Sequence, residues 1–286
     1  MILHEPESAL RHYLYAQEIR GRTRNTLKAY RYFIGRFLRE LGKPIDRIDT
    51  FDIREFLMRE KQSGNSESTI ATKINYLRSF FAWLYREEII MKDPAAKIDP
   101  IPQRLDVPKF LTHEEVELLR EACTEMVDRC LVEVLYSAGL RVSEASRLEW
   151  RDIDFPSMSL RVREGKGDKD RVVPFSTKAR LLLQKMRQQR NRQDDFLPCV
   201  FRSRHNRAMS PSSIERRIRA LGEVAGIKER VTPHRLRHSL ATHLLESGMP
   251  IDAIQKVLGH ERIHTTQIYA KTQQRNVEIY YRRVIA

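Results

Sequence analysis

A proline-rich segment near the middle of the chain sets the strongest limit on how it can fold. Residues 92–109, KDPAAKIDPIPQRLDVPK, hold four of the twelve prolines. Proline lacks a backbone N–H donor and resists helix formation, so an extended linker is expected here. The 286 residues also exceed one ordinary core and suit two domains. The sequence therefore predicts an N-terminal domain at 1–91, a linker at 92–109 and a second domain at 110–286.

The first domain is predicted to be helical. Apolar residues at helical spacing predict long helices over 24–41, which ends at Gly42, and over 66–88. Shorter helices are expected near 6–20 and over 51–62, the latter with Thr50 as its cap. The apolar stripes form a core. Basic residues on the opposite faces either contact phosphates of a nucleic acid or are simply solvated; they are Arg24, Lys28, Arg31 and Arg78.

The second domain is predicted to be mostly helical with one small sheet. Thr112 and Glu115 form the pattern of a capping box at its first helix. Between 152 and 175 the period changes, and DIDF, SLRVRE and RVVPF predict three short antiparallel strands. GKGDKD, residues 165–170, supplies the turn before the last strand. Helical patterns resume at 177–190 and 211–225 and continue to the C-terminus, so the fold class is mainly α.

Charge and cysteine content restrict the partners and the compartment. Lysine and arginine total 52 against 38 acidic residues, which gives a net charge of +14 and a pI near 9.9. Such an excess favours a polyanion, most often nucleic acid, over a merely basic soluble protein. Three separated cysteines fit a reducing interior. No signal peptide and no apolar run of roughly 18 residues is found, so a cytoplasmic protein without a membrane partner is expected.

The stretch TPHRLRHSLATHLLESG, residues 232–248, fits a metal site or a phosphate site. His234 and His238 have the spacing of a helical metal motif, but the neighbouring arginines would repel a cation and no acid lies between Val231 and Leu245. Thr232 as cap and Pro233 as first helical residue instead place His234 and Arg237 at a helix N-terminus, where anions bind. Phosphate is therefore favoured, with no metal and no cofactor, and His238 and His243 are expected to be packing or hydrogen-bonding residues.

Four further segments complete a pattern. SAGLRVSEASRL contains Arg141 and Glu144, GKGDKDR contains Lys166, and LGHERIHTTQIYA contains His260 and, nine residues later, Tyr269. In this order the motifs resemble the tyrosine recombinase (phage integrase) family, and the segments after residue 230 are most similar to its Xer branch. The resemblance implies an N-terminal SAM-like DNA-clamping domain and a catalytic domain whose terminal helix is exchanged between protomers. The alternative for that helix is packing onto its own domain.

The chemistry of the family explains these residue types. Arg141 and Arg237 are suited to bind the phosphate oxygens, because guanidinium is planar and permanently charged. His260 adds a hydrogen bond to the same phosphate. Tyr269 is the expected nucleophile, since its spacing from His260 favours it over Tyr280 and Tyr281.

The proton transfers need further groups. His234 accepts the phenol proton, and the resemblance assigns Lys166, rather than Lys169, as the acid for the leaving 5′-hydroxyl. Glu144 is expected to orient a base or a histidine from outside the reacting set, although Arg141 could also be a simple ion-pair partner of Glu144.

The resemblance implies a site-specific recombinase of the Xer type that resolves chromosome dimers as a tetramer on DNA with inverted half-sites. A mobile-element integrase and a type IB topoisomerase are the alternatives with the same chemistry, and a DNA-binding protein without chemistry is an alternative of another class. The charged fraction of 31% and the few glycines are typical of a hot-environment or archaeal source.

Overall fold

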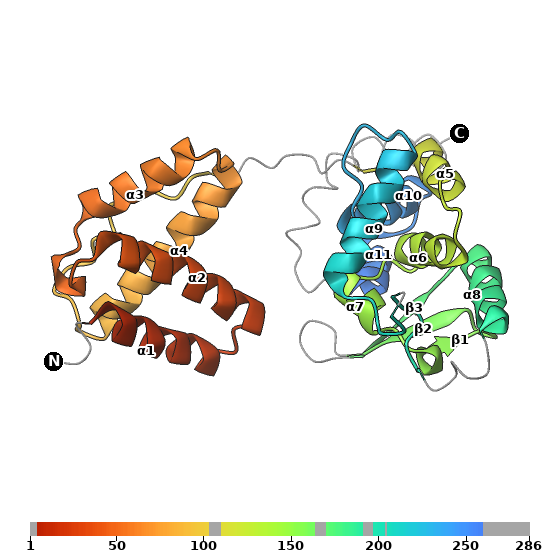
Figure 1. Ribbon diagram of the computed structural model, residues 1–286, viewed down its shortest axis with the longest axis horizontal. Helices are drawn as coiled ribbons and strands as arrows, with labels where there is room; N and C mark the ends of the chain where they lie inside the picture. Colours follow the sequence, from red (N-terminus) through yellow and green to blue (C-terminus); the bar gives the residue numbers. More distant parts are fainter. Residues whose placement is uncertain (1–4, 103–109, 164–169, 191–196, 204, 260–286) are drawn as a thin grey trace, which may run out of the picture. The chain divides into compact units, whose positions relative to one another are not determined.

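The computed structural model describes residues 5–102, 110–163, 170–190, 197–203 and 205–259 (Figure 1). The chain divides into two compact units, Met1–Leu105 and Asp106–Ala286, each with a hydrophobic core of its own. Helices dominate both units, as the sequence predicts. Within the described ranges, no helix is both long and apolar enough to cross a membrane.

The described part of the N-terminal unit consists of helices around an aromatic core. Its elements are α1 (Pro6–Ile19), α2 (Arg24–Leu41), the 3-10 turn η2 (Ile45–Arg47), α3 (Thr50–Gln62) and α4 (Glu67–Arg86). Phe37 lies edge-on to Phe56 and Phe81, with ring centroids 5.0 and 6.0 Å apart. All three rings are fully buried, so α2, α3 and α4 are joined through one set of aromatic contacts.

Capping residues set the ends of these helices. Gly42 ends α2 in the left-handed conformation, with φ of 59°, as predicted. The predicted cap of α3 is wrong by one residue, because Asp49 accepts the N–H groups of Phe51 and Asp52, and Thr50 is the first helical residue. The Thr50 hydroxyl donates instead to the carbonyl of Pro94 at 2.8 Å.

The described part of the predicted linker lies against the N-terminal unit. Ile98 is buried in the core of that unit, and its carbonyl accepts a hydrogen bond from Arg78 of α4. Arg78 therefore has a structural role, which leaves Arg24, Lys28 and Arg31 as the exposed members of the predicted basic set. Residues 103–109 lie outside the described ranges.

The second unit is built around one buried helix. Its helical elements are α5 (His113–Glu121), α6 (Met126–Ser137), α7 (Val142–Arg147), η3 (Trp150–Asp152), α8 (Thr177–Gln189), α9 (Pro211–Val224), α10 (Pro233–Glu246) and α11 (Ile251–Leu258). α6 packs against α5, α8 and α10 (Figure 1). Five of its apolar side chains are completely buried: Cys130, Leu131, Val132, Val134 and Leu135. This core holds α10, which carries the predicted phosphate residues.

The predicted sheet is present as three antiparallel strands. They are β1 (Ile153–Asp154), β2 (Ser159–Val162) and β3 (Arg171–Pro174), in the order β1-β2-β3. Leu160 of β2 pairs with Ile153 on one side and with Val173 on the other. All three side chains are buried, so one face of the sheet joins the core of the unit. β3 also contacts α11, which brings Arg171 next to the end of that helix.

Candidate active site around helix α10

The N-terminus of α10 begins where the sequence predicts. Thr232 is the cap, and its hydroxyl accepts the N–H of Arg235 at 3.1 Å. Pro233 occupies the first turn, where its missing N–H costs nothing. His234 and Arg237 are therefore three residues apart in the first turns and share one face.

Arg237 is buried and joins three segments of the chain. Its side chain is only 3% exposed, and its guanidinium donates to the carbonyls of Gly139 and Leu258. Gly139 has a φ of 59°, and a Cβ at this position would lie 2.7 Å from Leu258 and 2.9 Å from Leu240. Only glycine fits such a position, so the turn after α6 can approach α10 and α11 closely.

Arg141 caps α7 and is more open to solvent than Arg237. Its backbone N–H donates to Glu144 Oε2 and its Nη1 to Glu144 Oε1, both at 2.8 Å. Its Nη2 donates to the carbonyl of Gly259 at 3.0 Å. The Arg141 side chain is 31% exposed, so it is the arginine of this pair that a ligand can reach without rearrangement.

A third arginine, which the sequence analysis missed, completes this arrangement. Arg171 at the start of β3 binds Glu144 with two parallel hydrogen bonds of 2.8 Å. A Cβ on Gly259, whose φ is 64°, would lie 2.7 Å from Arg171 Cδ, so the end of α11 rests on this side chain. The only signal in the sequence was the position of Arg171 directly after the GKGDKD turn.

Glu144 keeps its negative charge because of these arginines. Burial by itself raises the pKa of this carboxyl, but the bonds from Arg171 and Arg141 outweigh burial and lower the pKa to about 2. The ion pair with Arg141, which the sequence left as the alternative for Glu144, is present, and Arg171 shares the same carboxylate. An orienting role toward a base or a histidine stays a prediction. Arg141, Arg171 and Arg237 supply three positive charges against this one carboxylate, which favours an anion and disfavours a metal cation.

His234 lies close to the same charges. Desolvation lowers the pKa of His234, and the charges of Arg237 and Arg141 lower it further. His234 is exposed to solvent overall, and the positive charges of the two arginines disfavour protonation of its ring. A neutral ring is therefore expected near pH 7. A neutral imidazole is the form that can accept a proton.

The structure thus brings together four of the predicted residues: Arg141, Glu144, His234 and Arg237. Lys166, His260 and Tyr269 lie outside the described residues, as do Lys169, Tyr280, Tyr281 and the predicted exchange helix. Gly259, the last described residue before His260, receives a hydrogen bond from Arg141. The roles of these residues remain predictions.

Comparisons with known proteins identify the family of the two units. Residues 109–276 match the model of the Phage integrase family, and residues 10–88 match the Phage integrase, N-terminal SAM-like domain. The chain is 37% identical over 268 residues to the tyrosine recombinase XerA of Pyrococcus furiosus, with 91% of this chain and 88% of the relative covered.

Solved structures share the fold. A crystal structure of XerA recombinase matches 97% of this chain and 99% of its own, with 30% identity and a TM-score of 0.56. A lambda integrase tetramer bound to a Holliday junction matches 90% of this chain and 77% of its own, with 20% identity and a TM-score of 0.71. The chain therefore belongs to the phage integrase family, among its tyrosine recombinases of the Xer type.

Proposed function

We propose that this protein cleaves and rejoins DNA strands at a specific site through a 3′-phosphotyrosine and thereby resolves chromosome dimers. The observation that carries the proposal is the meeting of Arg141, His234 and Arg237 at the N-terminus of α10. These groups come from two distant parts of the chain and leave the site positively charged. A phosphodiester under attack gains negative charge, which such a site stabilises.

The two arginines have different accessibility before DNA binds. Arg141 is partly exposed, whereas Arg237 is almost fully buried and its guanidinium is engaged by two carbonyls. For both guanidiniums to contact one phosphate, the atoms that cover Arg237 must move. DNA binding is then the step that completes the site.

The strand-exchange chemistry balances without a cofactor. The Tyr269 oxygen attacks phosphorus, the bond from phosphorus to the 5′-oxygen breaks, and Lys166 supplies the proton to that oxygen. His234 takes the proton of the phenol, and His260 donates a hydrogen bond to the phosphate. A 5′-hydroxyl of another strand then attacks the phosphotyrosine, and phosphate is exchanged between two esters. One ester bond replaces another, so the reaction needs neither ATP nor a metal ion.

The DNA partner is supported by surface charge. Arg24, Lys28 and Arg31 are exposed on α2 at spacings of four and three residues, which places them on one side of the helix. We assign them to phosphate contacts of the clamping domain. The similar lambda integrase binds a Holliday junction as a tetramer, and we propose a tetramer on paired half-sites here, with the C-terminal helix exchanged between protomers. Such a protein acts on the chromosome in the cytoplasm.

Trapping covalent adducts across the genome tests this function. The protein is incubated with nicked fragments of its own genome, denatured with detergent, and the DNA attached to it is sequenced. Adducts at one locus with inverted repeats, absent with Tyr269→Phe, are expected. Adducts scattered over the genome would instead show a topoisomerase-like activity and contradict the proposal. Adducts at the ends of a mobile element would show an integrase.

A further inference from the structure

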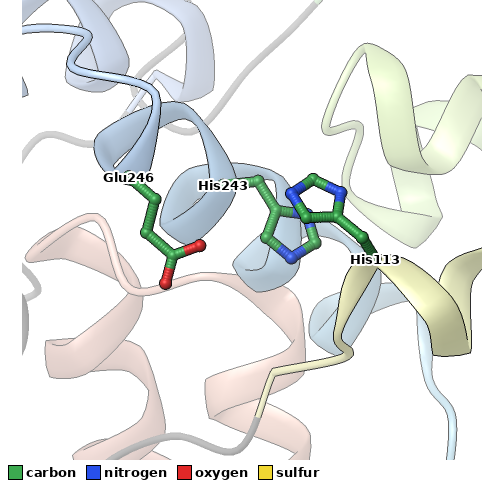
Figure 2. Close-up of side chains that lie close together, drawn as sticks. All are labelled: His113, His243 and Glu246. Carbon is green, nitrogen blue, oxygen red and sulfur yellow. The ribbon is translucent and has the colours of Figure 1, made fainter.

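A second histidine cluster lies at the other end of α10. Among the described residues, His113, His243 and Glu246 form a group in which the donor atoms of all three lie within 4.8 Å of one another. Figure 2 shows His113 extending from α5 and His243 and Glu246 from α10. His243 and Glu246 are three residues apart and therefore share a face of the helix. His113 and Glu246 are exposed, and His243 is 4% exposed.

The buried histidine is held in a defined orientation. Its Nδ1 lies 2.7 Å from the Tyr136 hydroxyl, and its ring stacks on that of His113 with centroids 3.8 Å apart. Among the described residues, none is a hydrogen-bond partner of its buried Nε2. A buried nitrogen without a partner costs free energy in a folded protein. When the Nδ1 proton is donated to Tyr136, the lone pair of Nε2 is free for a ligand, and such an outer hydrogen bond accompanies most metal-bound histidines.

Acidic groups accompany the histidine pair. Glu246 belongs to the cluster, and Glu114 directly follows His113 in the sequence. His234, in contrast, lies close to the charges of two guanidiniums.

The donor set fits a borderline metal such as zinc. Two imidazoles and one carboxylate are common ligands of zinc, with a fourth position left for water. Bonds of about 2.1 Å in a tetrahedron place donors roughly 3.3 Å apart. Donor atoms that lie up to 4.8 Å apart are therefore too widely spaced by as much as about 1.5 Å. The exposed side chains of His113 and Glu246 can rotate to shorten the distances between the donor atoms. This rotation breaks the stacking of the two rings, while His243 stays in place.

We propose that His113, His243 and Glu246 bind one divalent transition-metal ion of the zinc class. The ion ties the first turn of α5 to the last turn of α10. α10 carries His234 and Arg237 at its opposite end. Bound metal therefore stabilises the helix that presents the phosphate-binding residues, without taking part in their chemistry.

Metal titration of the full-length protein tests the site without reference to activity. Protein freed of metal with a chelator is titrated with zinc chloride in a calorimeter and with cobalt(II) in a spectrophotometer. One zinc ion for each chain and visible absorption of a tetrahedral cobalt centre are expected. His113→Gln and Glu246→Gln change exposed side chains, so both variants remain folded and are expected to lose this binding.

Three comparisons make the test selective. His205→Gln and Glu223→Gln remove an exposed histidine and an exposed carboxylate elsewhere in the same unit, and are expected to bind as the wild type does. Tyr136→Phe keeps all three ligands and removes only the bond to Nδ1, which is expected to weaken binding roughly 10–100-fold. Absence of zinc binding by the wild type would overturn the proposal. Binding of equal strength in His113→Gln and Glu246→Gln would do the same.

Discussion

Replacing Glu144 with glutamine removes the carboxylate between Arg141 and Arg171 while keeping the size of the side chain. The carboxyl has a pKa of about 2 in the folded protein against 4.5 in the unfolded chain. A depressed pKa stabilises the fold fully above pH 4.5, and this contribution is lost as the pH falls toward 2. A shift of this size corresponds to about 3 kcal/mol of unfolding free energy at pH 7. At pH 3 the same relation leaves about 1.4 kcal/mol.

The two tryptophans allow this effect to be measured in one unit at a time. Trp83 belongs to the N-terminal unit and Trp150 to the second, so a Trp83→Phe background reports urea unfolding of the second unit by fluorescence alone. In that background Glu144→Gln is expected to lower the unfolding free energy by about 3 kcal/mol at pH 7, with a smaller difference at pH 3. Glu223→Gln, which removes an exposed carboxylate 3.8 Å from Arg219, is expected to cost less than about 1 kcal/mol.

The pH dependence of the loss in unfolding free energy shows whether charge or packing causes it. A loss that is equal at pH 7 and pH 3 would mean that glutamine disturbs packing and that the charge of Glu144 contributes nothing. A loss below about 1 kcal/mol at pH 7 would mean that the two arginines do not stabilise this carboxylate, and the described arrangement would be refuted.

Two further variants test the contacts around the site. Gly259→Ala is expected to destabilise its unit by more than the roughly 1–2 kcal/mol of a left-handed alanine, because its Cβ also meets Arg171. Gly226→Ala, in the same unit and with open space at a φ of 69°, shows the cost of the left-handed conformation alone. Equal losses of unfolding free energy in the two variants would refute the close contact. Arg237→Lys replaces the planar guanidinium, which donates to the carbonyls of Gly139 and Leu258, with an ammonium group that lacks this geometry. The variant is expected to slow strand cleavage about 10²–10³-fold. Arg219→Lys serves as its control, and unchanged cleavage by Arg237→Lys would remove Arg237 from the site.

Local signals in the sequence predicted most of the fold. Thr112 and Thr232 cap the helices that follow them, because each accepts a backbone N–H only three residues away. The small sheet followed from a change of period, which also depends only on neighbouring residues. Asp49 was missed because it competes with the adjacent Thr50 for the same role, and only the backbone conformation decides between them.

Contacts between distant parts of the chain could not be predicted in this way. Arg171 and Glu144 are 27 residues apart, and their meeting depends on how β3 lies against α11 and α7. The bond between Tyr136 and His243 spans 107 residues, so no spacing rule reveals it. The meeting of Arg141 with Arg237 was expected from the resemblance to a family, whereas the residues alone indicated only a phosphate site on α10.

The identity of the nucleophile can be measured directly by mass spectrometry of a trapped adduct. A nicked substrate releases the short 5′-hydroxyl fragment, so the covalent intermediate accumulates and can be digested with nuclease and trypsin. Trypsin separates IHTTQIYAK, residues 263–271, from NVEIYYR, residues 276–282, so Tyr269 lies on a different peptide from Tyr280 and Tyr281. We predict a nucleotide linked through phosphate on residues 263–271. The same mass increase on residues 276–282, or an adduct that persists in Tyr269→Phe, would contradict the account.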